Sequence, residues 1–151
     1  MPIASLVFAT IAALLHVMFW VLESLRFRQE SVWRRFGVKS AADAEAVAPM
    51  AFNQGFYNLF LAIGALVGVG FSIASDDVHS GWVMYAPLSE HGPPSWLDLN
   101  GDLVGTTLII FTMACMLGAA LVLVATNRKL ARAAAIQGGP PALALLIALV
   151  A

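Results

Sequence analysis

Residues 103–125 read LVGTTLIIFTMACMLGAALVLVA, an apolar run without a single charged side chain. A helix needs about 20 apolar residues to cross the ~30 Å hydrocarbon core of a bilayer. This run is long enough to do so as one helix. It therefore indicates a transmembrane segment and predicts that the chain is an integral membrane protein.

Three further apolar runs of similar length occur along the chain. With the first, they predict helices over residues 3–25, 50–74, 103–125 and 131–151. Of the 151 residues, 60% are hydrophobic and 11% are charged, whereas roughly a quarter of the residues in soluble domains are charged. We expect a single all-α transmembrane domain over residues 1–151, folded as an up-down bundle of four helices.

The basic residues predict how this bundle is oriented. All eight lie in two short segments, after the first run and after the third: Arg26, Arg28, Arg34, Arg35, Lys39, Arg128, Lys129 and Arg132. Short loops rich in Lys and Arg stay in the cytoplasm. Both termini should therefore lie outside the cytoplasm, and residues 75–102 should form an extracytoplasmic loop. We expect membrane lipids as partners and no nucleic acid.

The segment before the second run should enter the membrane through a short amphipathic helical turn. Ser40 stands three residues before Asp43, the spacing of a helix capping box. Pro49 should kink the helix near the interface. Small residues four apart predict close helix packing, and they form three pairs: Gly64 with Gly68, Ala114 with Gly118, and Ala144 with Ala148.

Polar side chains inside the expected spans mark the candidate site. Such groups are costly in a bilayer, and they usually face the bundle interior and serve a function. The first helix carries His16 and Glu23, two helical turns apart on one face, with Trp20 between them. The second and fourth helices carry the remaining polar residues: Asn53, Gln54, Tyr57, Asn58 and Gln137.

Counting about 1.5 Å per residue from the inner interface places all these groups in the cytoplasmic half. We predict a polar pocket that opens inward, with His16 and Glu23 as a hypothetical acid and base. The pocket would be lined by the remaining polar residues of this layer: Trp20, Asn53, Gln54, Tyr57, Asn58 and Gln137.

Each of these residues also has a purely structural interpretation. Glu23 could pair with Arg26 three residues later at the membrane surface. His16 could hydrogen-bond to a neighbouring helix, and the amides could simply hold helices together at about 0.6 kcal/mol per bond. The run from Gly138 to Pro141 could be a helix kink.

Cysteine and histidine usage points away from a metal or cofactor. Cys115 is the single cysteine, so neither an intrachain disulfide nor a cysteine cluster can form. Acidic and histidine residues gather in the outer loop, but their spacing matches no known metal site: Asp76, Asp77, His79, Glu90 and His91. We expect no metal and no cofactor.

The chain resembles a family of small bacterial membrane proteins known as the domain of unknown function DUF1304. The resemblance rests on His16 followed by Glu23, on Phe36-Gly37-Val38, on NQGFYNLFLA at residues 53–62, and on Gln137-Gly138 with Pro140. Residues 78–101 look like an insertion. The resemblance implies a multi-pass protein of the bacterial plasma membrane and no particular activity.

Three kinds of function are compatible with these residues. The first, which we prefer, is binding or processing of a lipophilic small molecule in the polar pocket, and it leaves open whether the protein is an enzyme. The second is proton-coupled transport through Glu23, which would need a homo-oligomer because no inverted repeat is visible. The third is a structural or accessory subunit whose outer loop docks a partner.

Overall fold

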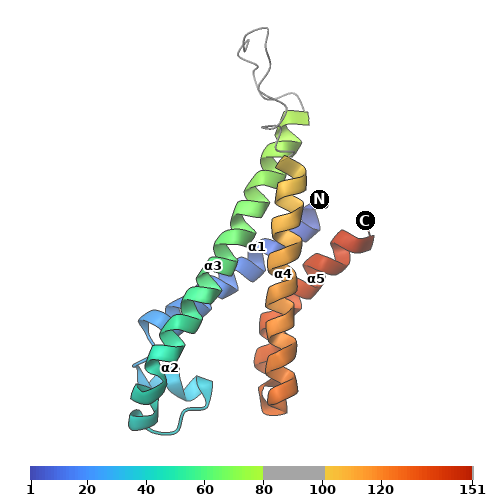
Figure 1. Cartoon of the computed structure of the whole chain (residues 1–151). Coiled ribbons are helices and arrows are strands. Elements are labelled where there is room, and N and C mark those ends of the chain that lie inside the picture. Colours follow the sequence, from blue (N-terminus) through green and yellow to red (C-terminus); the bar gives the residue numbers. More distant parts are fainter. Residues whose placement is uncertain (80–100, 151) are drawn as a thin grey trace.

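The computed structural model of the chain describes residues 1–79 and 101–150 (Figure 1). Every element in this part of the chain is helical. In chain order they are α1 (Ile3–Trp20), the π-helical η1 (Val21–Leu25), α2 (Glu30–Trp33), the 3₁₀ turn η2 (Arg34–Phe36), α3 (Ala41–His79), α4 (Gly101–Thr126), the 3₁₀ turn η4 (Arg128–Leu130) and α5 (Ala131–Val150).

Four of the continuous helical stretches are long and apolar enough to cross a membrane: Ile3–Leu25, Ala41–Ser75, Gly101–Thr126 and Arg128–Val150. This confirms the four spans expected from the sequence and is the pattern of a multi-pass membrane protein. The middle of the expected outer loop, residues 80–100, lies outside the described residues.

The four long helices form an up-down ring. Helix α1 packs against α3 and α5, and α4 packs against the same two helices from the opposite side. The terminal amine of Met1 lies 3.7 Å from Asp102 Oδ1, so the start of α1 meets the start of α4 at one end of the bundle. Both chain ends lie toward this end, and α2 lies at the other (Figure 1). All eight basic residues follow α1 or α4 and therefore lie at the α2 end.

Helices α1, α3 and α5 each bury a narrow stripe of mostly small side chains, whereas α4 also buries Ile109, Met113 and Met116. On α3 the stripe recurs at alternating spacings of three and four residues, the pattern of helices packed along a single seam: Gly55, Asn58, Ala62, Ala65, Val69 and Ser72. Large apolar side chains such as Phe60 and Phe111 point outward and are 61% and 64% exposed. Small residues inside and large apolar residues outside suit a bundle surrounded by lipid.

The backbones of α3 and α4 touch at a pair of glycines. A Cβ atom on Gly105 would lie 2.8 Å from the carbonyl oxygen of Gly68, and one on Gly68 would lie 3.0 Å from that of Gly105. Gly64 of α3 also faces α4, where Thr112 is its neighbour. The Gly64 and Gly68 pair thus packs as predicted, whereas Gly118 has nothing within 4 Å of its Cβ direction, and the predicted Ala114 and Gly118 contact is absent.

Helix α3 begins at Ala41, nine residues before the expected start at residue 50. Ser40 Oγ accepts a hydrogen bond from the backbone N–H of Asp43 at 3.1 Å, so the predicted cap starts this longer helix. Pro49 lies inside the helix. The reason is tertiary. Phe27 and Trp33 belong to the segment 26–40, which the sequence predicts to be the inner, cytoplasmic loop, and they pack with Ala44 in a small apolar cluster that also contacts Val47, Ala48 and Ala51. We call this set the inner-loop cluster.

Candidate ligand-binding site

Glu23 lies where the backbone leaves the α-helical pattern. The N–H of Arg26 donates to the carbonyl of Val21 at 3.0 Å, which is the five-residue bond of a π-helical turn. Turns of this kind are frequent at functional sites. A regular α-helix would place His16 and Glu23 on one face, and the π-helical turn changes that register.

The Glu23 carboxylate is held by α3. Asn58 is 8% exposed, and its Nδ2 donates to Glu23 Oε2 at 2.7 Å. No other hydrogen bond or ion pair reaches Glu23 from the described residues, so Oε1 is left without a protein partner. The alternative in which Glu23 pairs with Arg26 is not what the structure shows. A buried amide that anchors one oxygen of a carboxylate leaves the other oxygen available to a ligand.

Gly55 lets α3 approach the π-helical turn. A Cβ atom at this position would collide with Ser24 Oγ and would lie 3.1 Å from Glu23 Cβ. Ser24 Oγ in turn donates to the carbonyl of Phe52 at 2.9 Å, which ties the two segments together six residues before Asn58. Gly55 therefore sets the distance at which Asn58 reaches Glu23.

A hollow of about 340 Å³ opens beside Glu23 at the α2 end of the bundle. It lies between η1, the start of the inner loop and the first turns of α3. Its lining combines five apolar side chains with Glu23, Ser24 and one exposed ion pair: Glu23, Ser24, Leu25, Phe27, Arg28, Glu45, Ala48, Pro49 and Phe52. The ion pair joins Arg28 Nη2 to Glu45 Oε1 at 3.0 Å. We call this hollow the Glu23 hollow.

His16 is fully buried but is not part of the Glu23 hollow. Its Nδ1 lies 2.9 Å from the carbonyl of Ala12 and donates to it, since the carbonyl can only accept. His16 Nε2 and Trp20 Nε1, one turn apart on α1, are both enclosed without a hydrogen-bond partner in the described chain. Buried polar atoms are normally paired, so a water or a ligand group is the expected partner. His16 and Glu23 make no hydrogen bond to each other.

The other predicted lining residues are not gathered around Glu23. Asn53, Gln54 and Tyr57 are exposed on the outside of α3 and do not line the Glu23 hollow. The buried stripe of α3 runs through Gly55 and Asn58, so their neighbours necessarily point elsewhere. Gln137 is partly buried on α5 and is also absent from the lining.

Several residues of the hollow were missed from sequence. From sequence, Arg28 was noted only as a basic residue and Pro49 only as a kink, whereas Phe27 and Glu45 were not named as candidates. They come together because α3 extends back to Ala41 and the inner loop folds onto it. The sequence signal for this part of the site is aromatic, namely Phe27 next to the basic residues and Phe52 on α3, but only the longer helix places both near Glu23.

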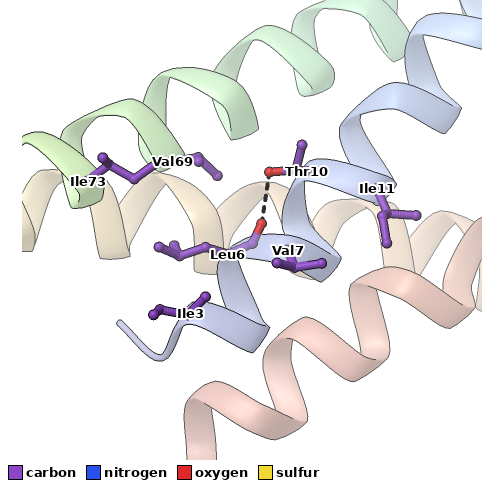
Figure 2. A pocket seen from close by; sticks show the side chains of 7 residues that line it. All are labelled: Ile3, Leu6, Val7, Thr10, Ile11, Val69 and Ile73. Atoms are coloured by element: carbon purple, nitrogen blue, oxygen red, sulfur yellow. Dashed lines mark hydrogen bonds between the residues drawn. The ribbon is translucent and has the colours of Figure 1, made fainter.

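A second, larger hollow of about 480 Å³ lies in the other half of the bundle, between α1 and α3 (Figure 2). Its lining side chains are apolar except for one threonine: Ile3, Leu6, Val7, Thr10, Ile11, Val69 and Ile73. Thr10 Oγ1 donates to the carbonyl of Leu6 at 2.8 Å, so its one polar group is already paired. This hollow offers contact area for hydrocarbon and no group for chemistry.

The described residues contain no cluster of His, Cys, Asp and Glu that could hold a metal ion. Of the outer-loop candidates, Glu90 and His91 lie outside the described residues, as do the side chains of Asp76, Asp77 and His79. The expectation of no metal there stays a prediction.

Four apolar helices packed as an up-down ring, with a carboxylate of η1 held by α3, place the chain among small all-α proteins with the pattern of membrane bundles. More particularly, the chain belongs to the DUF1304 family, described as a protein of unknown function, whose model matches residues 10–89 and 96–149. The matched ranges leave out residues 90–95, which lie inside the segment expected to be an insertion, residues 78–101. No curated protein and no solved structure matches the chain.

Proposed function

We propose that this protein binds an amphiphilic small molecule in the Glu23 hollow, at the cytoplasmic surface of the bacterial plasma membrane. The observation that carries the proposal is the Glu23 carboxylate, which borders a hollow with several apolar walls; one oxygen is held by Asn58 and the other has no partner among the described residues. Small-molecule sites combine apolar walls with a few placed polar groups, in volumes of roughly 300–1,000 Å³.

The proposal includes the orientation of the chain. All eight basic residues follow α1 or α4 and so share the end of the bundle that holds the Glu23 hollow. The excess of Lys and Arg favours that end as the cytoplasmic one, with both termini outside. An amphiphile dissolved in the inner leaflet would then reach the hollow without crossing the membrane.

The geometry favours binding over acid–base catalysis by His16 and Glu23. An acid and a base that act on one substrate must both come within hydrogen-bond reach of it. His16 is enclosed in the bundle and does not line the hollow that Glu23 borders. The proposed role of Glu23 is therefore that of a polar anchor.

The test is mass spectrometry of small molecules that co-purify with the detergent-solubilised protein. Wild type should retain a compound that is absent from Glu23→Gln, which keeps the shape of the side chain and removes its charge. The matched control is Glu30→Gln, since Glu30 is exposed, pairs with Arg34 and does not line the hollow. Identical compounds in wild type and Glu23→Gln would refute the proposal and favour an accessory-subunit role.

A further inference from the structure

We infer that the Glu23 hollow selects a lipophilic amine, bound as a cation, over neutral and anionic molecules of the same shape. The inference rests on the proposed function and names the chemical class of its ligand. Three observations carry it: the charges of the lining, the remaining oxygen of Glu23, and the aromatic rings beside it.

The lining contains three charged residues, and two of them cancel. Arg28 and Glu45 are paired at 3.0 Å, whereas Glu23 has no cationic partner among the described residues. The ion pairs found in that part of the chain join Met1 to Asp102, Arg28 to Glu45, and Arg34 to Glu30. When Glu23 is ionised, its charge is therefore the unmatched one in the lining, and a ligand cation would complete it whereas a ligand anion would be repelled.

The hydrogen-bonding capacity of Glu23 points the same way. A carboxylate only accepts hydrogen bonds, and Asn58 supplies one donor to Oε2. A protonated amine brings several N–H donors together with the positive charge, so it can satisfy Oε1 by a charge-assisted bond. An alcohol can donate one hydrogen bond but leaves the charge unmatched.

Aromatic and aliphatic side chains complete the site. Phe27 and Phe52 both line the hollow, and the electron-rich faces of such rings attract cations. Their positions are supported by neighbouring rings, Phe36 at 5.8 Å from Phe27 and Phe56 at 5.0 Å from Phe52 between centroids. Leu25, Ala48 and Pro49 provide the apolar surface for a hydrocarbon tail.

The experiment compares three probes with the same eight-carbon chain, namely octylamine, octan-1-ol and octanoate. Each is titrated by calorimetry into the full-length protein in detergent micelles, with empty micelles as the blank. Wild type should bind octylamine at least ten-fold more tightly than octan-1-ol and should bind octanoate least. In Glu23→Gln the preference for the amine should disappear, whereas Glu30→Gln should keep it.

Two further variants test the charge argument without touching Glu23. Glu45→Gln leaves Arg28 unmatched beside the hollow and should reduce the amine-to-alcohol ratio several-fold. Arg28→Gln should raise that ratio, and Lys39→Gln, which removes a basic residue from the same loop outside the hollow, should not change it. Arg28 and Glu45 are both exposed at the surface, so we expect these variants to fold like wild type.

The outcomes separate this inference from the proposed function. Equal affinity of wild type for octylamine and octan-1-ol would overturn the amine inference and leave amphiphile binding standing. An amine preference that survives in Glu23→Gln would also overturn it. Failure of all three probes to bind saturably to wild type would refute both the inference and the proposed function.

Discussion

At the scale of single residues, the site depends on a glycine as much as on its carboxylate. Glu23 stands out in any search for polar groups in an apolar helix, and Asn58 does so as well. Gly55 has no chemistry of its own, yet its missing side chain leaves the space that Ser24 Oγ fills. The contact between Asn58 and Glu23 follows from that close approach.

Gly55→Ala should therefore destabilise the protein by about 1–3 kcal/mol, the usual range for overpacking. The added methyl group would collide with Ser24 Oγ and press on Glu23 Cβ. Thermal unfolding in detergent should show a lower midpoint than wild type. Gly118→Ala is the control, because nothing lies within 4 Å of its added Cβ.

A double mutant identifies the source of the Gly55→Ala effect. Ser24→Ala removes the hydroxyl that the new methyl group meets and should make the two substitutions less than additive. Strict additivity would show that the loss of stability arises elsewhere on α3.

At the scale of elements, the unexpected feature is the extension of α3 at the α2 end of the bundle. The apolar run predicts the helix from residue 50 onward, and the preceding segment contains charges and Pro49. The extension forms because Phe27 and Trp33 pack with Ala44 and neighbouring apolar residues of α3, which outweighs local helix propensity. This cluster also forms one wall of the Glu23 hollow through Phe27 and Ala48.

Trp33→Ala should loosen this extension while leaving the membrane-spanning part of α3 intact. Trp33 is 6% exposed, and truncating a buried aromatic side chain typically removes about 3–5 kcal/mol of packing. Hydrogen exchange should therefore speed up at residues 41–49 and stay unchanged at residues 56–72, which belong to the bundle seam. Faster exchange over both segments would show that the inner-loop cluster is part of one cooperative unit with the bundle.

At the scale of the whole molecule, the up-down ring places every basic residue at one end and the chain termini at the other. The arrangement follows because consecutive long helices run in opposite directions along the bundle (Figure 1). It makes the location of the Glu23 hollow depend on the orientation of the bundle. A site for an amphiphile of the inner leaflet requires that the α2 end face the cytoplasm.

Cysteine labelling of intact cells checks this orientation. In a Cys115→Ala background, Val150→Cys should react with a membrane-impermeant maleimide, whereas Ser31→Cys should react only after the cells are opened. Both positions are exposed in the structure. The reverse pattern would place the Glu23 hollow on the outer side and contradict the proposed cytoplasmic site.

The number and order of the four long helices followed from the sequence alone, because crossing a bilayer requires long apolar runs and the chain contains four of them. Glu23 and Asn58 could be selected in the same way, as polar groups that are costly in hydrocarbon. The sequence could not predict which polar residue of α3 contacts Glu23. The candidates on α3 are equally polar, namely Asn53, Gln54, Tyr57 and Asn58, and of these only Asn58 lies on the buried stripe.

The tertiary structure alone decided where a ligand could bind. A π-helical turn altered the register between His16 and Glu23, a contact at Gly55 brought α3 within reach, and the inner-loop cluster closed one side of the hollow. Helix formation in a membrane depends on local composition, which a sequence displays directly. A pocket depends on which faces of distant segments pack together, and here that was settled by small residues and by Phe27 and Trp33, whose roles appear only once the chain is folded.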